Sequence, residues 1–116
     1  MTAAGPTARI LLVDDNPMKR LALKAILQPL GHTVVEADSG RAALRQCLIE
    51  DYAVILLDVR MPGMDGFETA SLIRQRPQSE MTPIIFITAF ASDEIDVSHR
   101  YVQGAVDFIF APVQPD

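Results

Sequence analysis

Three aspartates and one threonine stand at the ends of short apolar runs, and together these residue types can do chemistry. Asp14 and Asp15 follow the first run, Asp58 follows the third and Thr88 follows the fourth. If the runs are neighbouring strands of a parallel sheet, their carboxyl ends bring the four side chains to one edge. Carboxylates gathered there repel one another, so at least one pKa rises unless a cation joins them.

A hard divalent cation is the natural partner of three such carboxylates, because Mg²⁺ prefers oxygen ligands and keeps open positions for water. We therefore expect Mg²⁺, or Mn²⁺ in its place, at this edge of the sheet. With the cation bound, a carboxylate can act as a nucleophile toward phosphorus, and a hydroxyl can hold a phosphoryl oxygen. The pattern thus favours metal-assisted phosphoryl chemistry.

Each of these residues also has a purely structural interpretation. The pair Asp14-Asp15 can form a turn and cap a helix. Asp58 can be a turn residue at a strand end, and Thr88 can be an ordinary strand residue. The combination favours a functional site, because separate strands bring their polar groups to the same edge.

The segment DVRMPGMDG, residues 58–66, adds a short rigid loop after the third run. Pro62-Gly63 is a turn pair, and Gly66 permits a tight entry into the next helix. A loop of this kind would hold Asp58 still and present backbone carbonyls, including that of Arg60, to a metal ion.

The elements that must position these residues alternate along the chain. The apolar runs are nearly continuous, as in strands buried on both faces, and the segments between them have helical spacing. Asn16-Pro17 opens the first helix, Pro29 limits its end, and Ser39 caps the second helix. This alternation predicts an α/β fold with a parallel sheet covered by helices on both faces. The predicted strands are Ile10–Val13, Thr33–Ala37, Val54–Leu57, Ile84–Ile87 and Val106–Phe110, and the later helices are Ser39–Glu50, Gly66–Arg76 and Asp93–Gln103.

Length and charge limit the class of protein. The 116 residues suffice for one domain, expected at residues 9–116 after a flexible lead at residues 1–8. The net charge of −5 argues against direct nucleic-acid binding, and no apolar run is long enough to span a membrane. The single cysteine, Cys47, allows no internal disulfide and favours a cytoplasmic protein.

From Arg9 to about Val113, the sequence resembles the receiver domain of two-component response regulators. The resemblance rests on the motifs LLVDDNP, LLDVRMPGMDG, IIFITA and GAVDFIFAP in this order and spacing. It implies a flavodoxin-like, three-layer α/β fold with a five-stranded parallel sheet in the order 2-1-3-4-5. It also implies a signalling domain rather than an enzyme.

The resemblance implies roles for the acidic residues. Asp58 would be the phosphoacceptor and would take a phosphoryl group from a phosphohistidine of a sensor histidine kinase or a phosphotransfer protein. Asp15, Asp58 and the backbone carbonyl of Arg60 would bind the metal directly, and Asp14 would bind it through a water molecule.

The resemblance also implies a switch beside the acceptor. Thr88 and Ala89 would bind the phosphoryl group, and Phe108 would be the aromatic switch residue. The face formed by the fourth helix and fifth strand would meet a protein partner or output domain. A homodimer is a further expectation.

Two departures from the family pattern matter. The family has a lysine immediately before the fifth-strand proline, where this chain has Ala111, and the helix that normally follows is missing. We expect weak or atypical coupling of phosphorylation to output, because alanine cannot supply the positive charge. We hypothesise that the guanidinium of Arg60 reaches the phosphoryl region, against the alternative of a solvated loop arginine. Lys24, in the middle of the first helix, is expected to face solvent.

Rival functions remain open at this point. A phosphorylation-independent pseudo-receiver, acting as a protein-interaction module, is favoured by Ala111 and opposed by the intact acidic residues. A haloacid-dehalogenase-type phosphatase would need a second aspartate two residues after Asp58, where Arg60 stands. A flavodoxin-like cofactor binder would need a phosphate-binding loop where Asp14-Asp15 would repel the phosphate.

Overall fold

The computed structural model describes residues 8–88 and 107–110, and for Thr88 and residues 107–110 it describes the backbone. These residues form a five-stranded sheet in the order β2-β1-β3-β4-β5, with every neighbouring pair parallel. The strands are β1 (Arg9–Val13), β2 (Thr33–Ala37), β3 (Val54–Leu57), β4 (Ile84–Thr88) and β5 (Asp107–Phe110). The predicted fold class and strand order are therefore confirmed.

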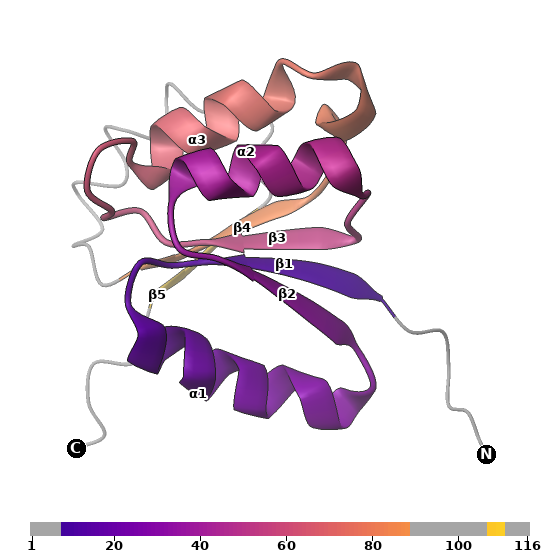
Figure 1. Ribbon diagram of the computed structural model, residues 1–116, viewed down its shortest axis with the longest axis vertical. Coiled ribbons are helices and arrows are strands. Elements are labelled where there is room, and N and C mark those ends of the chain that lie inside the picture. The colour runs from indigo at the N-terminus through magenta and orange to yellow at the C-terminus, as the bar shows by residue number, and fades with distance from the viewer. Residues whose placement is uncertain (1–7, 89–106, 111–116) are drawn as a thin grey trace.

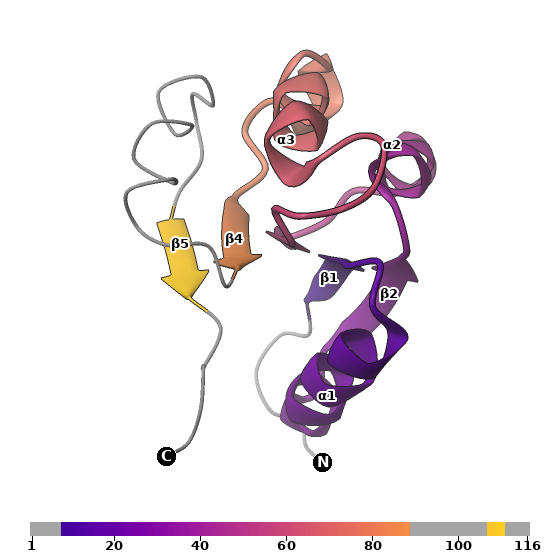
Figure 2. The same ribbon diagram turned by 90° about the vertical axis from the view of Figure 1, so that its left-hand side faces the viewer.

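Helices cover both faces of the sheet (Figure 1). Helix α1 (Pro17–Leu27) lies on one face, and α2 (Gly40–Ile49) and α3 (Gly66–Arg74) lie together on the other, as the turned view of Figure 2 also shows. Two short 3₁₀ turns, Gln28–Leu30 and Pro77–Ser79, follow α1 and α3. Among the described residues, no helix is long and apolar enough to cross a membrane.

The predicted helix starts are largely right, and their caps explain them. The side chain of Asn16 accepts hydrogen bonds from the amides of Met18 and Lys19, and that of Ser39 accepts one from the amide of Ala42. Helix α3 has a cap that we did not predict. Asp65 and Glu68 form a capping box, in which each side chain accepts from the other residue's amide.

The predicted ends are less accurate. The third helix ends at Arg74 rather than Arg76, because its last turn closes through the amide of Gln75 and the chain then turns at Pro77–Ser79. β1 begins one residue earlier than predicted, β4 ends one residue later and β5 begins one residue later. The predicted helix Asp93–Gln103 lies outside the described residues.

The core has two parts, one on each face of the sheet. The larger part lies under α2 and α3 and includes the fully buried residues Leu11, Ile55, Leu57 and Phe86. The smaller part lies under α1 and has three buried members, Ile10, Leu12 and Leu56. The strands bury side chains on both faces, which explains their nearly continuous apolar sequences.

Candidate functional site

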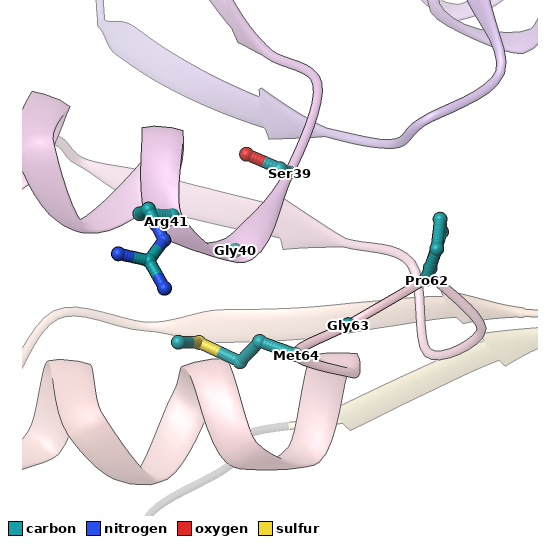
Figure 3. A pocket seen from close by; sticks show the side chains of 6 residues that line it. All are labelled: Ser39, Gly40, Arg41, Pro62, Gly63 and Met64. Carbon is teal, nitrogen blue, oxygen red and sulfur yellow. The ribbon is translucent and has the colours of Figure 1, made fainter.

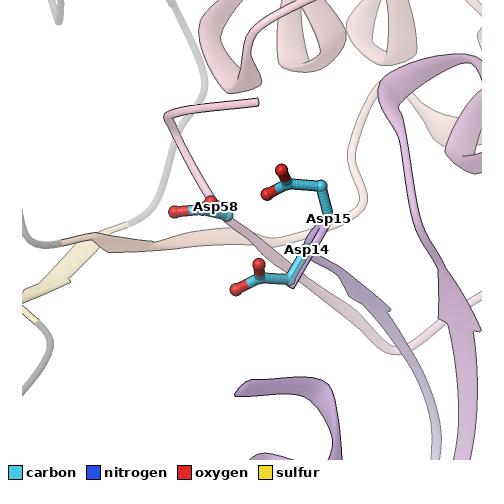
Figure 4. A group of neighbouring side chains, drawn as sticks. All are labelled: Asp14, Asp15 and Asp58. Atoms are coloured by element: carbon cyan, nitrogen blue, oxygen red, sulfur yellow. The ribbon is translucent and has the colours of Figure 1, made fainter. Parts of the chain in front are cut away.

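The three aspartates singled out by the sequence come together at the carboxyl ends of β1 and β3 (Figure 4). One carboxylate oxygen from each of Asp14, Asp15 and Asp58 lies within 4.8 Å of the others. Asp14 and Asp58 are buried, with 2% and 5% of their surface exposed, whereas Asp15 is exposed. The predicted convergence of the carboxylates is therefore confirmed.

The backbone of the sheet fixes two of these residues directly. The amide of Asp14 donates to the carbonyl of Ala37 at 3.1 Å, and the amide of Asp58 donates to the carbonyl of Val13 at 2.9 Å. Each aspartate thus directly follows a strand and is held by a backbone hydrogen bond to the neighbouring strand. The carboxylate of Asp14 also accepts from the amide of Asn16 at 2.9 Å, which fixes the turn into α1.

The loop from Asp58 to Gly66 is held against the sheet by close backbone packing. The amide of Gly66 donates to the carbonyl of Val59 at 2.8 Å. A Cβ at Gly66 would overlap the carbonyl oxygen of Asp58, so a side chain there would displace the loop. Gly63 has a φ of 77°, which suits the predicted Pro62-Gly63 turn. The loop is thus as tight as the sequence predicts.

A small pocket lies between this loop and the start of α2 (Figure 3). None of the three aspartates lines it, so it is separate from the acidic cluster. Its lining residues are Ser39, Gly40, Arg41, Pro62, Gly63 and Met64.

The acidic cluster changes the titration of Asp58. Burial and the neighbouring carboxylate of Asp14 raise the pKa of Asp58 to about 6, against the opposing pull of the Lys19 ammonium. Asp15 adds to the rise, and the amide of Val59 opposes it. Asp58 is therefore a buried carboxyl that is costly to ionise in the absence of a cation.

Lys19, in the first turn of α1, is a member of the site that our sequence analysis missed. Its Nζ atom lies 3.2 Å from Oδ2 of Asp14 and 3.6 Å from Oδ1 of Asp58, while 40% of its side chain is exposed. Burial lowers the pKa of Lys19, but the carboxylates of Asp58 and Asp14 outweigh this effect, and the net shift is upward. The sequence signal was a basic residue four positions after the acidic pair.

A second set of charges ties α1 to the sheet. The guanidinium of Arg20 donates to the carbonyl of Asp14 at 2.8 Å and to a carboxylate oxygen of Glu36 in β2 at 2.9 Å. Lys24 donates to the other oxygen of Glu36 at 2.9 Å. The expectation that Lys24 faces solvent is therefore right only in part, because its side chain is 34% exposed and Glu36 on the neighbouring strand binds its ammonium group.

The remaining predicted site residues are placed only in part. Arg60 is exposed on the loop after β3. Thr88 ends β4 at the same edge as Asp58, and in the strand register Phe108 lies beside Phe86. Ala89 and Ala111 lie outside the described residues.

Comparison with known proteins identifies the family. Residues 10–116 match the family model described as "Response regulator receiver domain". The chain belongs to this family. Among its relatives, PilH of Pseudomonas aeruginosa is 33% identical over 109 residues, which cover 94% of this chain and 89% of PilH. AfsQ1, a transcriptional regulatory protein of Streptomyces coelicolor, is 40% identical over 90% of this chain, which spans 45% of AfsQ1.

Solved receiver structures share the fold. Chemotaxis protein CheY4 of Vibrio cholerae is 34% identical, with a TM-score of 0.86 over 95% of this chain and 91% of CheY4. The response regulator TrrA of Thermotoga maritima is 33% identical, with a TM-score of 0.78 over 91% of this chain and 88% of TrrA, and its structure is a complex with Mg²⁺-BeF. The oxygen donors of Asp14, Asp15 and Asp58 fit a divalent cation of the same kind, because three carboxylate oxygens lie within 4.8 Å.

Proposed function

We propose that this receiver domain accepts a phosphoryl group on Asp58 in a two-component phosphorelay. The observation that carries the proposal is the position of Asp58, which is 5% exposed and lies within an acidic cluster whose oxygens approach within 4.8 Å. A buried carboxyl beside two others is costly to ionise, and such perturbed groups cluster at functional sites. The receiver family supplies the context in which such a residue is an acceptor.

The chain's own residues divide the work between nucleophile and ligands. A carboxylate oxygen of Asp58 attacks phosphorus, the P–N bond of the phosphohistidine donor breaks, and the leaving imidazole nitrogen keeps the electron pair. Asp15, Asp58 and the backbone carbonyl of Arg60 would hold Mg²⁺ or Mn²⁺, and Asp14 would contribute through a water molecule. When bound, the cation neutralises phosphoryl oxygens as charge develops on them.

Thr88 and Ala89 bind the phosphoryl group in this proposal, and Phe108 responds to it. The support for Thr88 is its place at the end of β4, at the same sheet edge as Asp58. The donor is a sensor histidine kinase or a phosphotransfer protein. The face of the fourth helix and β5 meets a protein partner, an output domain or a second copy of the chain.

A phosphorylation-independent pseudo-receiver is the second candidate. The observation that favours it is Ala111, which stands where the family pattern has a lysine. In this alternative the acidic cluster is retained, but the domain binds its partner equally well with or without phosphate.

Intact-mass measurement after incubation with acetyl phosphate and Mg²⁺ tests the proposal. We expect one added phosphoryl group on the parent protein, none on Asp58→Asn, and none on the parent when Mg²⁺ is removed with a chelator. Absence of the adduct from the parent at every workable donor concentration would favour the pseudo-receiver. An adduct that leaves partner binding unchanged would show acceptor chemistry without switching.

A further inference from the structure

We infer that Lys19 supplies, from helix α1, the positive charge that neutralises the acceptor site and binds the phosphoryl group on Asp58. This inference rests on the proposed function and adds a residue to it. The starting observation is the ammonium group of Lys19, which lies 3.2 Å from Asp14 and 3.6 Å from Asp58 and so bridges the two buried carboxylates of the cluster.

The position of Lys19 is set by the contacts on either side of it along α1. The amide of Lys19 is capped by the side chain of Asn16 at 3.3 Å. The next residue, Arg20, binds both the carbonyl of Asp14 and the carboxylate of Glu36. Because these contacts fix the first turn of α1 against β1 and β2, the side chain of Lys19 lies beside the acidic cluster.

The charges of the site explain what Lys19 would do. Asp14, Asp15 and Asp58 together carry three negative charges when ionised, so a divalent cation leaves one uncompensated, and the ammonium of Lys19 balances it. Phosphorylation replaces the single charge of the acceptor with up to about two negative charges. The site therefore contains more negative charge to be balanced, and Lys19 can balance it through a charge-assisted hydrogen bond to a phosphoryl oxygen.

The exposure of Lys19 allows it to follow the phosphoryl group. Its side chain is 40% exposed, whereas the carboxylates that it bridges are 3% and 6% exposed. The long flexible stem can therefore shift its ammonium from Asp58 to a phosphoryl oxygen without unpacking the core. The consequence is that α1 senses the charge on the acceptor, while the family pattern gives that task to a lysine just after β5.

A plain surface ion pair is the competing explanation, and it makes a different prediction. Such a pair would hold Asp14 without responding to ligands at Asp58, and exposed pairs contribute little energy. The two explanations predict different affinities of a Lys19 variant for a phosphoryl mimic. Substitution of Lys19 lowers that affinity strongly only if Lys19 contacts the phosphoryl group.

The test uses beryllofluoride as the phosphoryl mimic, with binding measured by titration calorimetry in saturating Mg²⁺. We expect Lys19→Met to weaken beryllofluoride binding by about tenfold to a hundredfold, the range for loss of a hydrogen bond to a charged group. Lys19→Arg, which keeps the charge, should lose much less. Lys24→Met is the matched control, because it removes the same charge from the same helix, and the native Lys24 contacts Glu36 rather than the acidic cluster. The beryllofluoride affinity of Lys24→Met should equal that of the parent.

A second readout uses Mg²⁺ alone. Because the ammonium of Lys19 repels a cation at the same carboxylates, Lys19→Met should bind Mg²⁺ several times more tightly than the parent, whereas Lys24→Met should not. Equal beryllofluoride affinity in Lys19→Met and the parent would overturn the inference while leaving the proposed function intact. If the parent itself binds no beryllofluoride, the proposed function fails. In that case, equal Mg²⁺ affinity of Lys19→Met and the parent would overturn the role of Lys19 as well.

Discussion

The two faces of the sheet support the acidic cluster by different means. On the face of α2 and α3, the support is apolar packing, and the tilted rings of Phe67 in α3 and the fully buried Phe86 in β4 have centroids 5.0 Å apart. On the other face, α1 contains no buried residue. Its partly buried Leu23 and Leu27 pack against the smaller core, and Lys19, Arg20 and Lys24 form ion pairs with the acidic cluster and with β2. The face of α2 and α3 therefore supports the acceptor loop by apolar packing, whereas a change of charge at the acceptor reaches α1 directly through Lys19.

The largest expected effect compares the two faces by truncating an apolar side chain on each. Phe86→Ala should lower the free energy of unfolding by about 3–5 kcal/mol, because it opens a cavity in the larger core. Leu21→Ala on α1, where the residue is 60% exposed, should change it by less than about 0.5 kcal/mol. Urea denaturation of both variants measures the difference. Similar losses in the two variants would show that Leu21 of α1 is packed as firmly as Phe86 of β4.

The next effect concerns the folding stability that is lost when the buried acceptor carboxyl ionises. The pKa of Asp58 rises from 3.8 to about 6 in the folded protein, so ionisation destabilises the fold. Asp58→Asn removes this cost and should stabilise the metal-free protein by up to about 3 kcal/mol at pH 8.

The pH dependence of this gain has a definite sign. Because the folded state holds the proton of Asp58 more tightly than the unfolded chain, the gain is absent below about pH 4, grows between the two pKa values and is complete above about pH 6. Denaturation of Asp58→Asn and the parent in a chelator, from pH 4 to pH 8, checks it. A gain that does not change with pH would contradict the assignment of the cost to this carboxyl.

The smallest effect tests the charged attachment of α1. Glu36→Gln weakens the ion pairs with Arg20 and Lys24 and should cost up to about 1 kcal/mol at low salt, and less at high salt. The hydrogen bonds from Lys24 and Arg20 lower the pKa of Glu36. Its contribution is therefore present at neutral pH and is lost as the pH falls through the folded pKa. Thermal melts at two salt concentrations measure the cost, and a cost independent of salt would point to packing instead.

Much of the fold could be predicted because local sequence determines it. Continuous apolar runs such as Val54–Leu57 mark strands that are buried on both faces. Asn16 and Ser39 mark helix starts through their own side-chain hydrogen bonds. The capping box of Asp65 and Glu68 has an equally local signal, the spacing of three residues, and could have been recognised.

The contacts of α1 could not be predicted in the same way. Lys24 pairs with Glu36, twelve residues away in the sequence, and that pairing depends on how α1 lies across β2. Lys19 has the same difficulty, because a lysine in a first helical turn is ordinary on a surface. Its role becomes visible only when the ends of β1 and β3 are placed beside the helix.

The backbone bond from the amide of Asp58 to the carbonyl of Val13 has a consequence for hydrogen exchange. The amide directly follows β3 and closes the end of the β1–β3 pair, on a residue whose surface is 5% exposed. Its proton can exchange with solvent when the carboxyl ends of β1 and β3 separate, so its exchange rate reports opening at this end of the strand pair. Hydrogen exchange at the amide of Asp58 thus measures how readily the strands open beside the residue proposed to receive the phosphoryl group.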